Sequence, residues 1–172
     1  MPLLTYSQQQ TIKKISANNQ QKYDPLATDV EEKDLKKLLG VALLQDLQKS
    51  PNAANNVLLL DGDSFVDCNG NTVDQKGVRW MTAYLNFSAY LGNSFVNDTF
   101  TGFVQKTRQD AEILSEGAIK RLQLENRQIA LTEWELIEAY LNENKDNFPL
   151  WVCTDSKKPF TPKFIGIRKT IK

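Results

Sequence analysis

The stretch LLLDGDSFVDCNGNTVDQKGVRWMTAYLNFSAYL, residues 58–91, decides the fold expected for this chain of 172 residues. Its middle holds Asn69-Gly70, and both residues tolerate the positive φ angles that a type I′ turn requires. The flanking segments Phe65–Cys68 and Asn71–Asp74 therefore predict a β-hairpin. Because an isolated hairpin is only marginally stable in water, we expect this one to pack on helices or to pair with another chain.

Apolar segments lie on both sides of this hairpin. The run Val57–Leu60 before it predicts entry into a compact β element, and Gly77–Leu91 after it predicts the central helix. A helix that is apolar over most of its circumference is buried. Aromatic rows can line a ligand pocket, but we favour a packed core here. Two adjacent rows carry this pattern, one made of Trp80, Tyr84, Phe87 and Leu91 and the other of Met81, Leu85 and Ala89.

Two further helices are expected. The first spans about Asp29–Lys49, because Thr28 and Glu31 fit a capping box and leucines recur at helical spacing until Pro51. The last spans about Ser115–Asn144, which would make it about 45 Å long. A helix of this length is longer than is needed to cover a core of this size. We therefore expect that part of this helix meets a neighbour or that it breaks near Leu131-Thr132.

Three segments have no clear helical periodicity. Residues 1–27 are rich in glutamine and asparagine and are expected to form an arm, either frayed or ordered against a neighbouring subunit. The loop 92–107 carries three phenylalanines, which we expect to dock on the chain's own core or on another subunit. Residues 152–172 form an extended basic tail. The predicted fold is mainly α, a bundle of about three to four helices within residues 28–151, with the hairpin 64–74 inserted.

Composition narrows the class of protein. The 21 basic side chains balance the 21 acidic ones, so net charge does not favour nucleic acid as the main partner. Cys68 and Cys153 are expected to be reduced thiols, with a disulfide between them as the alternative. The N-terminus lacks the pattern of a signal peptide, and no apolar run is long enough to span a membrane. We therefore expect a soluble protein made in the cytoplasm.

The strongest enzyme-like motif is Gly62-Asp63-Ser64-Phe65, which resembles the nucleophile motif of GDSL esterases. A serine nucleophile needs a neighbouring base, which in that family is histidine, and this chain has no histidine. The esterase serine also precedes a helix, whereas Ser64 leads into the predicted hairpin. We therefore expect no enzymatic activity.

Metal and cofactor sites are not expected either. Asp61, Asp63, Asp67 and Asn69 suggest a calcium loop, but the sixth position of such a loop requires glycine and here is Val66. Turn chemistry at the edge of the hairpin explains these residues better. Two isolated cysteines are too few for structural zinc. No phosphate-binding glycine motif is present, so no cofactor is predicted.

Several segments, taken in order, resemble small head–tail connector (neck ring) proteins of tailed bacteriophages, particularly those of crAss-like and other Bacteroidetes phages. The resemblance covers about residues 29–151. It is carried by Leu35-Lys36-Lys37-Leu38-Leu39-Gly40 continuing to Asp46-Leu47, the Asn69-Gly70 hairpin, Gly77-Val78 leading into Ala83-Tyr84-Leu85 and Ala89-Tyr90-Leu91, Gly102-Phe103-Val104-Gln105-Lys106, and Asn144-Lys145-Asp146-Asn147-Phe148-Pro149-Leu150-Trp151.

The resemblance implies a structural virion protein, assembled in the host bacterial cytoplasm, that forms a ring of about twelve copies in the phage neck. Its implied partners are further copies of itself, the portal protein, other neck or tail proteins, and the packaged DNA passing through the channel, with no membrane partner. Ring closure needs two different complementary faces on each subunit. The candidate subunit-interface residues are Val66 and Val73 in the hairpin and Phe95, Phe100 and Phe103 in the loop.

The alternative function is a nucleic-acid-binding module that uses the basic tail. Interleaved phenylalanines and the absence of acidic residues would let the tail contact phosphates. We favour instead a solvated terminal strand or a strand donated to a neighbour's sheet. The candidate contact residues are Lys157, Lys158, Lys163, Arg168, Lys169 and Lys172.

Overall fold

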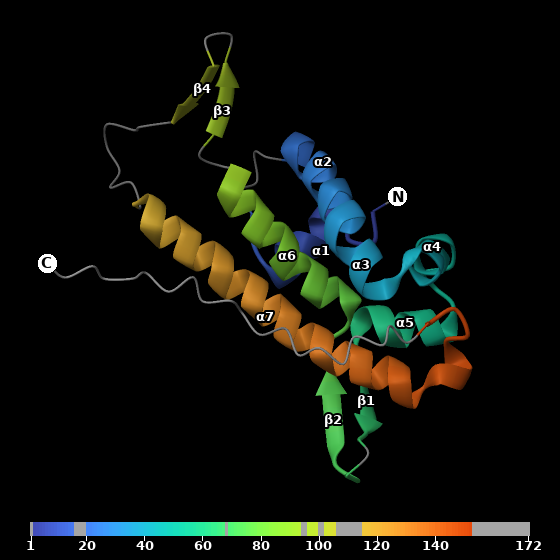
Figure 1. Ribbon diagram of the computed structural model, residues 1–172. Coiled ribbons are helices and arrows are strands. Elements are labelled where there is room, and N and C mark those ends of the chain that lie inside the picture. Colours follow the sequence, from blue (N-terminus) through green and yellow to red (C-terminus); the bar gives the residue numbers. More distant parts are fainter. Residues whose placement is uncertain are drawn as a thin grey trace, which may run out of the picture.

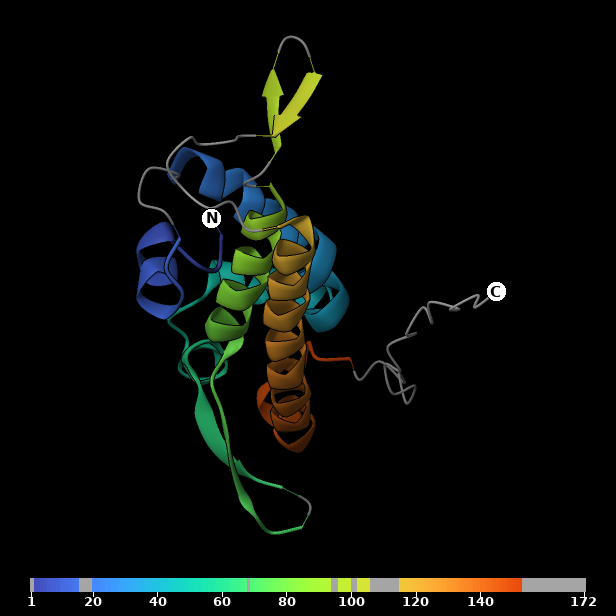
Figure 2. The same ribbon diagram turned by 90° about the vertical axis from the view of Figure 1, so that its left-hand side faces the viewer.

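Two long helices, α6 (Val78–Asn93) and α7 (Glu116–Glu143), lie side by side at the centre of the computed structural model (Figures 1 and 2). α7 begins where predicted, at Ser115, whose side-chain oxygen accepts a hydrogen bond from the Ala118 amide. It continues through residues 131 and 132 as one helix. The structure describes residues 2–15, 20–67, 69–93, 96–99, 102–105 and 115–152, with side chains described for 2–15, 23–67, 69–93 and 115–152. The predicted mainly helical fold with an inserted hairpin is confirmed.

One hydrophobic core joins these two helices to the shorter helices and to the end of the described chain. Full burial of an aliphatic side chain contributes about 1.5–3 kcal/mol to folding, so this cluster supplies most of the driving force. Its largest fully buried side chains are Leu35, Leu39, Leu43, Leu47, Leu59, Leu60, Met81, Leu85, Ile137 and Leu141.

The single helix expected over residues 29–49 is divided into several segments. α2 (Gln20–Val30) continues into a π-helical turn, Glu31–Leu35, and then into α3 (Lys36–Leu39). Gly40, at φ 77°, breaks the helix, and α4 (Val41–Lys49) follows and ends before Pro51 as predicted. The predicted capping box is wrong, because Thr28 lies inside α2, where its hydroxyl donates to the Asp24 carbonyl at 2.9 Å.

The apolar run Val57–Leu60 is helical rather than part of a β element. It belongs to α5 (Ala54–Asp61), which buries Leu59 and Leu60 and leaves Val57 and Leu58 exposed. A run of four apolar residues does not distinguish a buried strand from one face of a short helix. The connection between α4 and α5 therefore ends at Ala53.

The predicted hairpin is present as β1 (Asp63–Val66) paired antiparallel with β2 (Thr72–Gln75). Its turn differs from the predicted type I′, because only Gly70 has positive φ among the described turn residues. The Gly70 amide donates to the Asp67 carbonyl at 3.0 Å, and the Asp67 amide donates to the Asn71 carbonyl at 2.9 Å. This pattern is a three-residue loop closed by a glycine bulge. A second hairpin pairs β3 (Val96–Thr99) with β4 (Gly102–Gln105).

Two glycines permit a close crossing at the base of the β1–β2 hairpin, where α5 ends and α6 begins. Gly62 has φ 106° and Gly77 has φ 90°, both in the region that disfavours other residues. A Cβ at Gly77 would lie 2.3 Å from the Leu60 carbonyl oxygen, and a Cβ at Gly62 would lie 2.7 Å from the Gln75 carbonyl oxygen. Neither position has room for a side chain.

The N-terminal residues fold onto the same chain, in contrast to the expected arm. They form α1 (Tyr6–Ile12) and most of α2, which pack against α6. Buried polar groups make this contact: Tyr23 donates its hydroxyl hydrogen to the Leu4 carbonyl, and Asn86 donates to the Tyr23 oxygen, each at 3.1 Å. Gln9, also fully buried, donates to the Ala83 carbonyl. These hydrogen bonds act together with a small apolar cluster of Ile15, Tyr23 and Ala27.

The described chain closes against α7. A short 3₁₀ turn, Lys145–Asn147, leads to Phe148 and then to Trp151, both of which are buried in the core. The Trp151 ring meets the Trp134 ring edge to face at 5.9 Å, and its indole nitrogen donates to Asn142 at 3.1 Å. Among the described residues, no helix is both long and apolar enough to cross a membrane.

Candidate assembly surfaces

The sequence had led us to expect the aromatic row of α6 in the packed core, but the row lies at the edge of the core, and its Trp80 lines two surface grooves. Trp80, Tyr84 and Phe87 are half-buried, and the opposite face of α6 supplies the core residues Met81 and Leu85. The rings of Trp80 and Tyr84 stack, with centroids 4.2 Å apart. In Figure 2, α1 and α7 lie on the two sides of α6.

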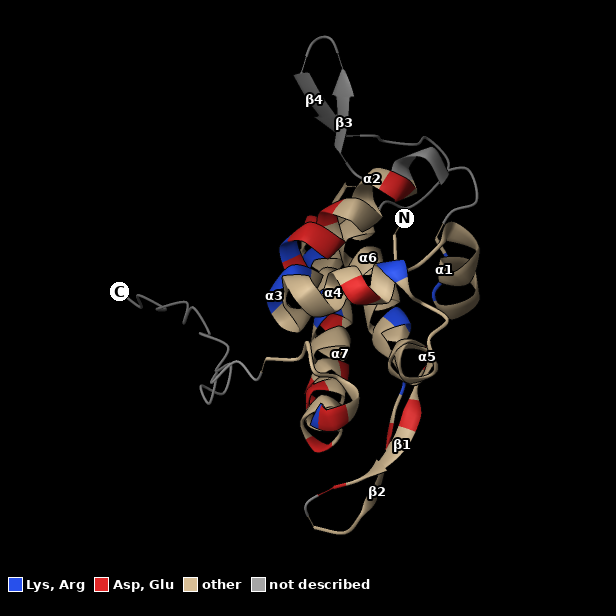
Figure 3. Ribbon diagram, turned by 90° about the vertical axis from the view of Figure 1, so that its right-hand side faces the viewer, with Lys and Arg blue, Asp and Glu red and all other residues tan. Residues whose placement is uncertain are grey.

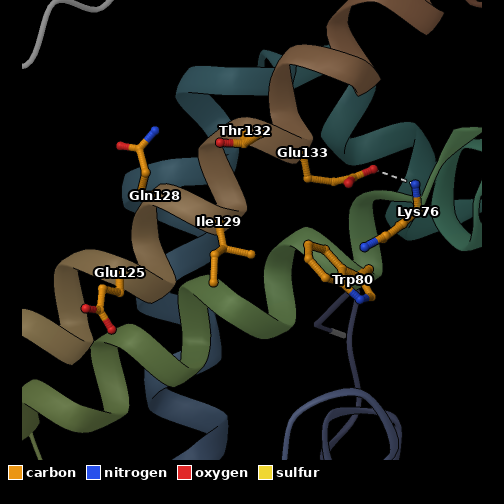
Figure 4. Close-up of a pocket in the computed structure, with 7 residues that line it drawn as sticks. All are labelled: Lys76, Trp80, Glu125, Gln128, Ile129, Thr132 and Glu133. Carbon is orange, nitrogen blue, oxygen red and sulfur yellow. Dashed lines mark hydrogen bonds between the residues drawn. The ribbon is translucent and has the colours of Figure 1, made fainter. Parts of the chain in front are cut away.

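A groove of about 530 Å³ runs between this row and α7 (Figure 4). Trp80 and Ile129 form much of its apolar wall, and Ile129 is 42% exposed. The Lys76 ammonium lies over the Trp80 ring, 4.4 Å from its centroid, which is a cation–π contact. Polar groups from α7 complete the rim at Glu125, Gln128, Thr132 and Glu133.

The polar groups of this groove already have partners or face solvent. Glu133 is buried and accepts a hydrogen bond of 2.5 Å from the Lys76 backbone amide, which fixes the end of β2 to α7. Glu125 pairs with Arg121 along the exposed side of α7. An apolar floor with a polar rim is typical of a surface that docks another protein.

A second groove, of about 280 Å³, lies on the other side of Trp80. Ile12 and Thr11 of α1 form one wall, and Arg79 and Asp61, which form an ion pair, form another. The Lys13 ammonium lies 4.9 Å from the ring centroids of both Tyr84 and Phe87, so α1 also covers part of the aromatic row. Sequence reasoning missed both grooves because their walls come from segments distant in sequence.

The two hairpin residues proposed for the subunit interface differ in exposure. Val66 is 59% exposed, whereas Val73 is half-buried and packs against the core. The cross-strand partner of Val73 is Phe65, whose ring meets the Tyr140 ring of α7 at 5.7 Å. One face of the hairpin therefore belongs to the core, and of the two residues only Val66 is freely available to a partner.

The hairpin turn is held by the Asp67 carboxylate. One of its oxygens accepts from the amides of Asn69 and Asn71, at 2.9 and 2.8 Å. These hydrogen bonds, that of Asn71 above all, lower the pKa of the Asp67 carboxyl. Of the acidic residues that suggested a calcium loop, Asp67 thus holds the turn, whereas Asp61 pairs with Arg79 and Asp63 accepts a hydrogen bond from Tyr140. Within the described residues, no group of three or more cysteine, aspartate or glutamate side chains is arranged to hold a metal ion.

Ser64, the serine of the esterase-like motif, lies on an exposed strand. Its hydroxyl donates to the Asp74 carboxylate at 2.6 Å across the hairpin. Asp63 of the same motif accepts a hydrogen bond of 3.2 Å from the Tyr140 hydroxyl, and the pKa of Tyr140 is raised to about 12, chiefly by burial. The motif therefore fixes the hairpin to α7.

Glu31 is a buried carboxylate with a structural role. It is 6% exposed and accepts hydrogen bonds from the Leu3 amide at 2.5 Å and from the Gln48 side chain at 2.9 Å. It thereby joins the start of the chain to α4. Burial raises the pKa of its carboxyl, and the two hydrogen bonds offset part of that rise.

The remaining predicted site residues lie outside the residues whose side chains are described. They are Phe95, Phe100 and Phe103 of the loop, Cys68 and Cys153, and Lys157, Lys158, Lys163, Arg168, Lys169 and Lys172 of the tail.

Comparison with known proteins gives a family without an assigned activity. Residues 35–161 match the family of unknown function DUF6712, and the chain belongs to that family. No curated protein and no solved structure matches it. The matched residues include both long helices, the β1–β2 hairpin and the α7 wall of the larger groove.

Proposed function

We propose that this protein is a structural subunit of a tailed-phage neck, which assembles into a ring between the portal and the tail and extends the DNA channel. The observation that carries the proposal is the half-buried Trp80 ring of α6, which borders two open grooves, one toward α7 and one toward α1. Such a surface fits a protein partner better than a small molecule, because the grooves are open and their polar groups already have partners or face solvent.

The arrangement of two unlike surfaces supports assembly into a ring. The grooves lie on one part of the molecule, while the β1–β2 hairpin projects away from the helices (Figures 1 and 3). Ring formation requires heterologous contacts, in which one surface of a subunit meets a different surface of the next. The resemblance to neck connectors, which covers most of the family match, supplies the phage context.

Two substitutions on α7 test this proposal. Ile129→Glu places a charge in the larger groove, whereas Leu124→Glu changes a residue that is 69% exposed and does not line that groove. Both chains are expected to fold, since both side chains are exposed. We expect Ile129→Glu to weaken self-association or portal binding at least about tenfold, the equivalent of about 1.4 kcal/mol, and Leu124→Glu to leave both unchanged. Size-exclusion chromatography with light scattering measures this association. If the two variants associate equally well, the larger groove is not an assembly surface.

The alternative, nucleic-acid binding by the basic tail, makes a different prediction. Binding of the monomer to duplex DNA would weaken steeply as salt rises, because phosphate contacts displace counterions. A neck subunit is expected to bind its protein partners at salt concentrations that remove such DNA binding.

A further inference from the structure

We propose that the outer edge of β1 accepts the C-terminal segment 163–172 of a second copy of this chain as a third strand. The inference deepens the proposed assembly role, on which it rests, by naming the segment that joins neighbouring subunits. It follows from the open edge of the hairpin, from the charge around it, and from the composition and reach of the tail.

The β1–β2 sheet has only two strands in the described structure, so both of its edges lack a strand partner. Because Asp67 and Asn71 exchange a backbone hydrogen bond, the alternation of an antiparallel ladder makes the next pair, Val66 and Thr72, a non-bonded one. The pair that contains Ser64 is non-bonded for the same reason. The backbone N–H and C=O groups of Ser64 and Val66 thus point toward the outer edge of β1.

The two edges have different surroundings. β2 packs along α7, and the hydrogen bond from the Lys76 amide to Glu133 fixes its end there. On β1, Ser64 and Val66 are exposed, and the hairpin extends beyond the helices (Figure 3). An exposed edge with an apolar side chain is a template for strand addition, which natural proteins either cover or use.

Acidic residues occur on the hairpin and at the C-terminal end of α7 (Figure 3). Asp67 and Asp74 belong to the hairpin, and Glu135, Glu143 and Asp146 belong to α7 and the turn after it. None of these five forms an ion pair with a basic side chain of the described residues. Glu138 also lies on α7. Burial is the main cause of the raised pKa of its carboxyl, and the nearby Glu135 charge raises it further.

The other acidic region of the molecule differs in this respect. Along α2 and the π-helical turn, Asp29 pairs with Lys33 and Glu32 pairs with Lys36, while Asp34 meets Arg127 of α7 at 2.7 Å. Its negative charge is therefore balanced locally. The hairpin end is the acidic surface that lacks such balance within the described residues.

The tail has the complementary charge. Residues 157–172 carry six basic and no acidic side chains, so the other 156 residues carry 21 acidic and 15 basic ones. Segment 163–172 is also rich in residues that favour strands, namely Phe164, Ile165, Ile167, Thr170 and Ile171. The chain is fixed at Trp151, and the eleven residues from there to Pro162 span up to about 36 Å when extended, enough to reach a neighbouring subunit.

Full-length proline variants test the contact. Val66→Pro removes an outward N–H from β1 and preserves the β1–β2 hydrogen bonds. Thr72→Pro makes the same change on the outer edge of β2 and is the matched control. Ile165→Pro/Gly166→Pro removes neighbouring N–H groups from the tail, one for each edge of a strand, and retains every charge. Circular dichroism checks that each variant is folded, and sedimentation velocity measures self-association.

We expect Val66→Pro and the tail variant each to weaken self-association at least about tenfold, and Thr72→Pro to leave it unchanged. A mixture of Val66→Pro with the tail variant should recover a heterodimer, because one chain supplies an intact tail and the other an intact edge. Association that is unchanged by both blocking variants overturns the inference and leaves the ring proposal intact. If the full-length chain is monomeric and Val66→Pro releases its tail, the tail docks on the hairpin of its own chain, and this result also overturns the inference. Portal binding then tests the proposed function separately.

Discussion

Replacing Gly77 with alanine should destabilise the protein more than any other glycine-to-alanine change in its described part. Gly77 has φ 90°, and an alanine Cβ there would lie 2.3 Å from the Leu60 carbonyl oxygen and 2.7 Å from the Gly62 nitrogen. The left-handed conformation costs a residue with a side chain about 1–2 kcal/mol. Overpacking against fixed backbone costs about 1–3 kcal/mol more. The expected loss is therefore about 3 kcal/mol or more.

Two other glycines separate these effects. Gly70 has φ 82° but open space around it, so Gly70→Ala should cost only the conformational part, about 1 kcal/mol. Gly117 lies in the first turn of α7, where an added Cβ would meet no other atom. Gly117→Ala should therefore stabilise the protein by about 0.5 kcal/mol. Urea unfolding followed by circular dichroism measures all three. If Gly77→Ala costs no more than Gly70→Ala, the close crossing at the base of the hairpin does not exist in solution.

Three further predictions concern the other corrected or unexpected features. Burial raises the pKa of the Glu31 carboxyl, so the folded state holds that proton more tightly and stability falls as pH rises from the unfolded pKa near 4.5 toward the folded value; Glu31→Gln should flatten this fall in urea midpoints measured from about pH 4 to 7, and an unchanged slope would contradict the assignment. Trp151→Ala should cost about 3 kcal/mol and Leu150→Ala, at a 44% exposed position, less than about 1, as thermal unfolding can show; similar losses would mean that Trp151 is not part of the core. Ser115→Ala removes the cap of α7 and should cost about 1 kcal/mol, whereas Thr28→Ala, inside α2, should change stability by less than about 0.5; the reverse order would restore the capping box at Thr28.

The sequence predicted best where local signals and packing agree. α6 and α7 carry long helical patterns, and α7 begins at the predicted position, after its cap Ser115. The Asn69-Gly70 pair located the hairpin, although the turn has one residue more than a type I′ loop. These elements follow from periodicity and turn chemistry, which act over a few neighbouring residues.

The N-terminal helices were missed because polar residues make a large share of their buried contacts, beside a small apolar cluster of Ile15, Tyr23 and Ala27. Gln9, Tyr23 and Asn86 are buried through hydrogen bonds to one another and to backbone carbonyls. In the sequence alone, a segment rich in such polar residues is indistinguishable from a solvent-exposed arm. Only the tertiary structure shows that a buried polar group has its partner, often far away along the chain.

The candidate site was missed for a related reason. The spacing of Trp80, Tyr84 and Phe87 places them on one face of α6 but does not say what covers that face. Here α1 and α7 flank that face, so a row expected in the core is half-buried, and Trp80 lines two grooves. The exposure of an apolar row depends on neighbours that helical periodicity does not encode.

The proposal that this chain builds a ring on a phage portal is tested most directly by electron microscopy of the purified protein mixed with a portal protein encoded in the same genome. The account predicts a discrete ring of this protein seated on one end of the portal, with cyclic symmetry. Portal particles that remain bare, beside a chain that stays monomeric at high concentration, would contradict it.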